Sequence, residues 1–254
     1  MKIAVAYKWA PNPQDATVAA NGSVDWSRAK SSVSEYDQVA VELGRRLADA
    51  TGAELLGISV GAADIASPMA RKAALSRGLD RLVLVSDDLL AGAGATRTAA
   101  VLAQVVAQVG DIDLVLTGDS SSDLGAQLVP AILAVMLGWP VVTTVTSVVG
   151  TAGDLTVDRV QDSGTQTLHV TGPAVLAVAA DAAVPRVPGM KDILAAGKRP
   201  VDVMDVPAPA PDPVTVISTG PPALKARKRQ VIDGTDPAAA AAVLVAALRT
   251  DNVI

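Results

Sequence analysis

The sequence predicts an α/β protein with a mostly parallel sheet, an antiparallel extension of that sheet and an extended C-terminal arm. Up to Pro140, short apolar runs alternate with longer amphipathic segments, which is the pattern of parallel strands joined by helical crossovers. After Pro140, extended runs follow one another without a helix. Near the C-terminus a proline-rich stretch follows, and the chain has few further segments that could form a core. We therefore expect one domain over residues 1–200 and an arm over residues 201–254.

The parallel part contains four apolar runs of strand length, each flanked by polar or turn residues. These predicted strands are residues 2–7, 55–60, 82–85 and 114–117. Three segments with apolar residues at helical spacing lie between them, and we expect helices over residues 34–51, 63–77 and 96–109. The dipeptide Asn21-Gly22 favours a tight turn, so a small hairpin is predicted over residues 17–26.

The extension and the arm are predicted from composition. Four extended runs separated by Gly, Asp and Ser indicate antiparallel strands over residues 141–149, 155–160, 166–170 and 174–179. In the arm, Pro207–Pro213 is expected to be a stiff linker, followed by the basic run Lys225–Arg229 and a helix over residues 238–248. Because the arm has few core-forming residues, we expect it to pack on a partner. A disordered tail is the alternative.

Composition excludes several classes of function. A net charge of -5, with three Trp, two Tyr and no Phe, argues against nucleic-acid binding. Cysteine is absent, which excludes disulfides, thiolate catalysis and Cys-built zinc sites. No apolar run reaches the roughly 18 to 20 residues of a membrane span, and the apolar run before Lys8 is too short for a signal peptide. We expect a cytoplasmic protein.

No catalytic constellation or metal site is predicted. The single histidine, His169, lies in a strand-like run without a Ser or Asp partner at a suggestive spacing. Neither an HExxH motif nor an EF-hand spacing occurs. The segment Gly92–Arg97 begins like a dinucleotide fingerprint, but Arg97 stands where a third glycine is needed, so a loop leading into a helix is favoured over a cofactor site.

The stretch Gly118–Pro130 is the strongest candidate for a ligand site. It gathers Ser120, Ser121, Ser122 and Asp123 at the carboxyl end of a predicted parallel strand, where open α/β sheets bind ligands. We expect free amides at residues 125–129, at a helix start that suits a phosphate. Asp123 is expected to cap the helix or to contact a ribose hydroxyl. A capped helix with solvent-facing serines explains the same residues, so both interpretations remain open.

The chain resembles the electron transfer flavoprotein beta subunit family in six blocks whose order and spacing agree with that family. The most specific block holds Val157-Asp158-Arg159, Asp162, Gln166, Leu168 and Pro173–Ala177. The other five are Ile3–Lys8, Ser34–Glu42, Ala73–Arg81, Gly118–Pro140 and Pro185–Pro200. Ser34-Glu35 and Ala183–Val187 depart from the family pattern, as does Val160 in place of a common Glu, which suggests a specialised paralogue with its own redox partner.

The resemblance implies a Rossmann-like fold of the adenine nucleotide alpha hydrolase-like type and an electron carrier rather than an enzyme. It further implies a heterodimer with an alpha subunit that holds most of the FAD. The donor would be a flavin-dependent dehydrogenase, and the acceptor a quinone reductase or another protein. The arm would embrace the alpha subunit.

The resemblance also implies which residues bind. The beta chain would bury an AMP, or a second FAD as in electron-bifurcating relatives. The implied contacts are Ala6, Ser34, Tyr36, Asp37, Val60, Asp123, Gly125, Ala126, Gln127, Leu128 and Val129. The segment 184–193 would dock on dehydrogenases through Arg186, Met190 and Ile193, with Met190 as the apolar anchor. Ordinary core packing is the alternative for Met190.

Two other classes compete with this hypothesis. A stand-alone adenine-nucleotide-binding module of the universal-stress-protein type would need neither the sheet extension nor the arm. An ATP-splitting ligase or hydrolase would need a Ser-Gly-Gly-x-Asp-Ser loop after the first strand, where this chain has Lys8–Pro13.

Overall fold

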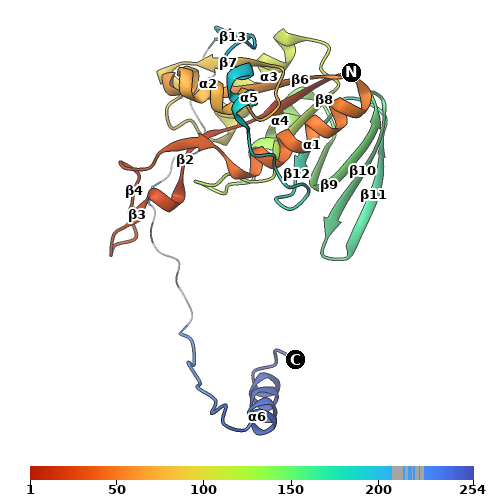
Figure 1. Cartoon of the computed structure of the whole chain (residues 1–254). Helices are drawn as coiled ribbons and strands as arrows, with labels where there is room; N and C mark the ends of the chain where they lie inside the picture. Colours follow the sequence, from red (N-terminus) through yellow and green to blue (C-terminus); the bar gives the residue numbers. More distant parts are fainter. Residues whose placement is uncertain (208–213, 215–216, 219, 221–222, 224–225) are drawn as a thin grey trace. The chain divides into compact units, whose positions relative to one another are not determined.

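The structure is a computed structural model that describes residues 1–207, 214, 217, 218, 220, 223 and 226–254. The chain divides into two compact units, Met1–Thr219 and Gly220–Ile254. The first unit holds the sheet and the helices around it, and the second holds one helix (Figure 1). Most of the predicted proline-rich linker, residues 208–213, and Lys225 of the basic run lie outside the described residues.

A nine-stranded sheet forms the first unit, in the order β11-β10-β9-β12-β8-β1-β6-β7-β13 (Figure 1). In the part of this order that runs from β9 through β12, β8, β1, β6 and β7 to β13, each strand pairs in parallel with the next. The strands of this parallel part are β1 (Lys2–Ala6), β6 (Glu54–Gly61), β7 (Arg81–Ser86), β8 (Leu114–Gly118), β9 (Val141–Thr151), β12 (Ala174–Val178) and β13 (Val201–Val203). Ala6 pairs with both Ile58 and Thr117, so the carboxyl ends of β1, β6 and β8 lie at one edge of the sheet.

Helices cover both faces of the sheet, as the alternating sequence predicts. Successive residues of β1 alternate between two cores, with Ile3 and Val5 in one and Ala4 and Ala6 in the other. The first core includes buried residues of α1 (Glu35–Thr51) and α2 (Pro68–Leu75), and the second those of α3 (Ala95–Val109) and α4 (Val129–Leu137). Both faces are therefore buried, as in other parallel sheets.

The antiparallel extension is confirmed for three of its four predicted strands. β9, β10 (Asp154–Gln161) and β11 (Gly164–Val170) form an antiparallel meander at one edge of the sheet. The prediction is wrong for the fourth strand, because β12 pairs in parallel with both β8 and β9. All five residues of β12 are buried and apolar, which is typical of a central parallel strand rather than of a half-exposed antiparallel one.

The predicted helix over residues 63–77 is broken. A 3-10 turn, η2 (Ala63–Ala66), precedes α2, whose N-cap Ser67 accepts a hydrogen bond from the Ala70 amide at 3.2 Å. Pro68 explains the break, since proline starts a helix well but cannot continue one.

The remaining elements are short. The predicted hairpin is confirmed, and a second small pair lies beside it: β3 (Thr17–Val18) with β4 (Val24–Asp25), and β2 (Trp9–Pro11) with β5 (Ser31–Val33). Two further 3-10 turns are η1 (Pro13–Asp15) and η3 (Asp88–Leu90), and α5 (Met190–Ala196) precedes β13. β13 continues the sheet beyond residue 200, where the sequence suggested a boundary. In the second unit, the helix predicted over residues 238–248 is α6 (Pro237–Thr250), and Asp236 caps its start.

Candidate functional site

A cavity of about 460 Å³ lies at the carboxyl ends of β1, β6 and β8, between the starts of α3 and α4. Most of its wall is apolar, with Val60, Leu90, Leu102 and Leu128 among the lining residues. Its polar wall comes from the end of β8 and from the residues that follow β1 and β8, including Lys8, Thr117, Asp119 and Asp123. This is the position at which open α/β sheets hold their ligands.

One side of the cavity is fixed by Asp37, in the first turn of α1. Its carboxylate accepts a hydrogen bond from the Lys8 amide at 2.7 Å and another from the Gly118 amide at 3.0 Å. A β-carbon on Gly118 would lie 2.7 Å from Asp37 Oδ1 and 2.7 Å from Tyr36 Cβ. Glycine is therefore required at position 118 for α1 to approach the ends of β1 and β8 this closely.

The same burial changes the acidity of Asp37. Only 5% of the residue is exposed, and this desolvation raises the pKa of its carboxyl to about 7. The hydrogen bonds from the amides of Lys8 and Gly118 favour the ionised form and oppose the rise. Asp37 consequently titrates near neutral pH.

An ion pair lies in the polar wall of the cavity. Lys8 Nζ and Asp123 Oδ2 are 2.6 Å apart, and only 9% of the Asp123 side chain is exposed. Burial works to raise the pKa of Asp123, but the hydrogen bond and the charge of Lys8 outweigh it, and the pKa lies below its ordinary value. Lys8 thus compensates the negative charge that Asp123 brings into the cavity.

Several buried oxygens in the cavity wall have no hydrogen-bond partner among the described residues. They are Thr117 Oγ1, Asp119 Oδ1 and Asp123 Oδ1. Burial also raises the pKa of Asp119. Because buried polar atoms are nearly always paired in folded proteins, these oxygens call for partners that the described residues do not supply, either water or the hydroxyl or amino groups of a ligand.

Most of the predicted binding residues line the cavity. Those that do are Ala6, Asp37, Val60, Asp123, Ala126, Gln127, Leu128 and Val129. Ser34, Tyr36 and Gly125 are not among the lining residues and support the wall instead. Ser34 Oγ accepts a hydrogen bond from the Ser122 amide at 3.4 Å, and Tyr36 packs over Gly118.

The predicted free amides at the helix start are only partly present. α4 begins only at Val129, the last of the residues expected to offer a free amide, and the Gly125 amide donates to the Ser121 carbonyl at 3.1 Å. Gly125 and Gln127 have φ values of +61° and +56°, so the chain turns through left-handed conformations before the helix can begin. Pro130 has no amide hydrogen, which leaves the amides of Val129 and Ala131 in the first turn.

Three contributors to the site were missed by the sequence prediction. Lys8 is the second residue after β1, and Thr117 is the penultimate residue of β8, positions at which parallel strands present side chains to a ligand. The third is Gly92–Ala95, which was assigned only as a loop leading into a helix. It does lead into α3, with Gly94 as the N-cap, but it also lines the cavity.

The predicted recognition segment lies on the surface, apart from the cavity lining. Met190 is 72% exposed, so the alternative of core packing is wrong for this residue. Ile193 is half-buried on α5. Arg186 is bound to Glu42 of α1, with Nε 2.7 Å from Glu42 Oε2.

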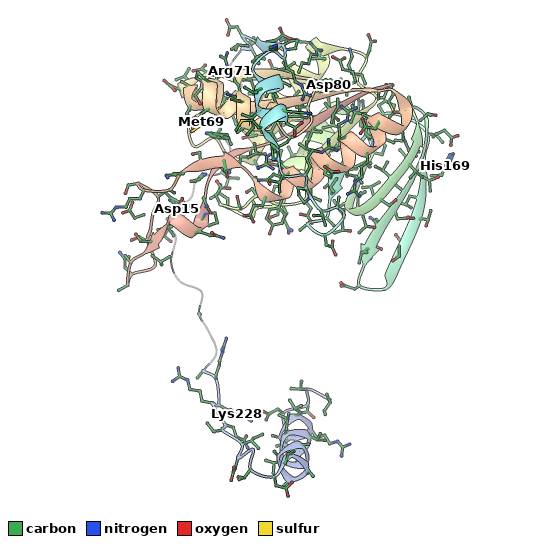
Figure 2. The ribbon with its side chains drawn as sticks, viewed as in Figure 1. Asp15, Met69, Arg71, Asp80, His169 and Lys228 are labelled. Carbon is green, nitrogen blue, oxygen red and sulfur yellow. The ribbon has the colours of Figure 1, made fainter. Side chains whose placement is uncertain are left out.

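His169 does have an acidic neighbour. Its Nε2 lies 2.6 Å from Asp154 Oδ1, and both side chains are well exposed on the β10–β11 hairpin (Figure 2). Neither residue lines the cavity. Among the described residues, no group of three or more His, Asp or Glu side chains is placed to hold a metal ion. In that same part of the chain no helix is long and apolar enough to cross a membrane.

Comparison with known families agrees with this architecture. The family model described as the electron transfer flavoprotein domain matches residues 22–209, which covers α1 to β13 and nearly all of the cavity wall. Members of this family carry electrons in partnership with other proteins. The chain therefore belongs to the electron transfer flavoprotein domain family.

Proposed function

We propose that this chain is the beta subunit of a heterodimeric electron transfer flavoprotein and that it binds AMP in the cavity between α3 and α4. The alpha subunit would hold most of the redox-active FAD. Electrons would come from a flavin-dependent dehydrogenase and leave to a quinone reductase or another acceptor. The observation that carries the nucleotide assignment is the set of unpaired buried oxygens beside the Lys8–Asp123 ion pair.

The apolar part of the cavity fits a planar base. Val60, Leu90 and Leu102 line it from β6, η3 and α3. Contact with aliphatic side chains removes the faces of a purine from water, which is the main favourable term for such a group. The cavity volume of about 460 Å³ is within the usual range for small-molecule sites.

The unpaired oxygens fit a ribose. Asp119 Oδ1 and Asp123 Oδ1 can accept hydrogen bonds from the two free ribose hydroxyls, and the Thr117 hydroxyl can donate to the ring oxygen of the sugar. A bound sugar would thus remove the cost of leaving these oxygens buried and unpaired.

The phosphate needs positive charge, which the chain supplies in two forms. Lys8 is the only lysine or arginine among the lining residues, and its side chain is 41% exposed at the cavity wall. The helix starts at Ala95 and Val129 add the positive ends of two helix dipoles. The residues present therefore fit an adenine nucleotide, with Lys8 as the side chain that would contact its phosphate.

A second FAD is the other candidate ligand. The loop Gly92–Ala95 at the start of α3 also lines the cavity. A dinucleotide could place its second phosphate near the positive end of the α3 dipole.

The proposed heterodimer is supported by exposed apolar side chains in both units. In the first unit, Val135 of α4 is 80% exposed, Val149 of β9 is 57% exposed and Val160 of β10 is 48% exposed. Within the second unit, α6 buries none of its residues, although Val243, Leu244 and Val245 are apolar. An apolar helix that lacks a buried face of its own is typical of a segment that packs on another chain. A stand-alone nucleotide-binding module would need neither feature.

Reconstitution tests the proposal. The chain would be co-expressed with the alpha-subunit candidate encoded beside it, and candidate flavin dehydrogenases would be screened for reduction of the complex. We expect a 1:1 complex with a flavin spectrum that bleaches when the correct dehydrogenase and its substrate are added. A chain that stays monomeric in the presence of the alpha subunit would refute the assignment.

A further inference from the structure

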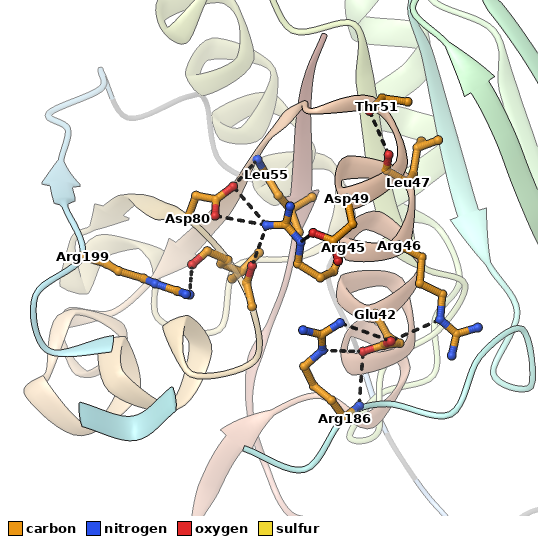
Figure 3. Close-up of polar contacts among 12 residues, drawn as sticks. Glu42, Arg45, Arg46, Leu47, Asp49, Thr51, Leu55, Asp80, Arg186 and Arg199 are labelled. Carbon is orange, nitrogen blue, oxygen red and sulfur yellow. Dashed lines mark hydrogen bonds and ion pairs between the residues drawn. The ribbon is translucent and has the colours of Figure 1, made fainter. Parts of the chain in front are cut away.

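Glu42 of α1 joins the helix to the segment that follows β12. Its carboxylate accepts three hydrogen bonds from Arg186: from the backbone amide at 3.3 Å, from Nε at 2.7 Å and from Nη2 at 3.4 Å (Figure 3). Arg46 Nε donates to the same carboxylate at 3.2 Å, from one helical turn further along α1. Only 9% of the Glu42 side chain is exposed. One buried carboxylate thus holds both the side chain and the backbone of Arg186.

A second anchor lies at the other end of the segment. Arg199 Nη1 donates to the Leu75 carbonyl at 2.8 Å and also to the Leu79 carbonyl, which ties the end of α5 to the end of α2. Ala196 is 2% exposed and belongs to the first core. Residues 186 to 199 are therefore fixed at both ends to the body of the first unit.

The residues near and between these anchors are apolar and face solvent. Val184 is 83% exposed, Val187 90%, Met190 72% and Leu194 63%. Inside the segment, the Gly189 amide donates to Asp192 Oδ2 at 2.8 Å, which caps the start of α5. These exposed side chains gain nothing from core burial, so outside the packing of α5 on α2 the conformation of the segment depends on its anchors.

We propose that Glu42 is a positioning residue that acts through Arg186 to hold segment 184–194 in one conformation, so that its apolar side chains are presented together to the electron-donating dehydrogenase. This inference rests on the proposed function, since it assumes that the segment docks on that partner. Anchoring reduces the conformational entropy that docking would otherwise remove, and affinity rises accordingly. It also gives Arg186 a role within this chain rather than in direct contact with the partner.

The charge of Glu42 makes this anchor persistent. Partial burial works to raise the pKa of Glu42, but the hydrogen bonds from Arg186 and Arg46 outweigh it and hold the pKa below the ordinary value of 4.5. The carboxylate therefore stays ionised at neutral pH. A hydrogen-bonded charge pair of this kind is more stabilising than an exposed ion pair, because its removal leaves a buried partner unsatisfied.

Hydrogen exchange on the full chain tests the anchor without any partner. Glu42→Gln and Arg186→Gln remove the charge pair, and both should speed exchange of the hydrogen-bonded amides of Ala182 and Gly189 by about tenfold or more. Arg46→Gln is the matched control, because Arg46 binds the same carboxylate but is 55% exposed and belongs to α1 itself. It should leave exchange in this segment within about twofold of the wild-type rate. Unchanged exchange in Arg186→Gln, or an equal increase in Arg46→Gln, would overturn the anchoring role.

The same variants test docking in the reconstituted heterodimer. With the dehydrogenase that reduces it, Glu42→Gln and Arg186→Gln should raise the heterodimer concentration for half-maximal rate about tenfold and leave kcat unchanged, whereas Arg46→Gln should change neither. Faster exchange with an unchanged half-saturation would overturn the positioning role in docking. If no dehydrogenase reduces the heterodimer, the proposed function fails, while the exchange experiment still decides whether Glu42 anchors the segment.

Discussion

The Asp37 carboxylate accepts a hydrogen bond from the Gly118 amide at 3.0 Å, although the two residues lie 81 positions apart in the chain. Its other oxygen binds the amide of Lys8, so one side chain at the start of α1 joins the segments that leave β1 and β8. Both segments contribute to the cavity wall. The shape of the candidate site therefore depends on this contact.

Asp37 should make stability depend on pH. Its folded-state pKa of about 7 lies above the ordinary value of 3.8, so between these pH values the folded chain binds a proton that the unfolded chain lacks. The contribution of Asp37 to the free energy of unfolding is fully present below pH 3.8. It decreases as the pH rises to about 7, by up to about 4 kcal/mol in total.

Urea unfolding of the wild type and of Asp37→Asn at several pH values measures this effect. The free energy of unfolding of the wild type, relative to that of the variant, should fall as the pH rises from 5 to 7, because other groups titrate equally in both proteins. Parallel pH profiles for the two proteins would show that Asp37 ionises normally.

Gly118→Ala should destabilise the chain by about 2–4 kcal/mol, through overpacking against Tyr36 and loss of the Asp37 hydrogen bond. Thermal or urea unfolding provides the measurement. Gly172→Ala is the matched control, since a β-carbon there meets no atom within 4 Å. A Gly118→Ala protein as stable as this control would mean that α1 is not held as closely to β8 as the structure indicates.

Lys8→Gln should weaken AMP binding about tenfold more than it weakens adenosine binding, because both ligands are affected by the loss of the Lys8–Asp123 ion pair but only AMP has a phosphate that needs the charge. Calorimetric titration of both ligands measures the difference. Lys2→Gln is the control, since Lys2 stands at the opposite end of β1 and its Nζ donates to the Gly110 carbonyl. If the affinities for AMP and adenosine fall by the same factor in Lys8→Gln, Lys8 does not bind the phosphate.

Met190→Ala should raise the heterodimer concentration for half-maximal reduction by the dehydrogenase about tenfold, as expected for an apolar anchor. Stability and cofactor content should not change, because the side chain is exposed. Met69→Ala, at a methionine that is 67% exposed on α2, serves as the comparison. Equal kinetics for the two variants would remove Met190 from the docking surface.

Local patterns predicted most of the fold. The strand and helix periods located β1, β6, β7 and β8 and the helices α1 and α3, and the Asn21-Gly22 turn located the small hairpin. The direction of β12 was not predictable from spacing alone, because a short run between turns can pair in either direction. Its uninterrupted apolar sequence, Ala174–Val178, was the available signal for a parallel central strand.

The candidate site was predicted less completely, because it is built from contacts between distant segments. The polar stretch after β8 identified Asp123, but nothing local to it shows that Lys8 neutralises its charge. The loop Gly92–Ala95 does not match the dinucleotide motif, but it lines the cavity. It is brought there because β7, which precedes it in the chain, pairs with β6, and the sequence does not show this pairing. Arg186 was expected on a partner-facing surface, and its bond to Glu42 depends on a tertiary contact across 144 positions.

The most direct test of the account is the identity of the nucleotides in the purified heterodimer. The complex would be denatured, and the released small molecules would be identified and counted by mass spectrometry. The account predicts one AMP and one FAD per heterodimer, with the AMP lost in Lys8→Gln and retained in Lys2→Gln. A heterodimer that releases FAD but no adenine nucleotide from this chain would contradict the assignment of the cavity.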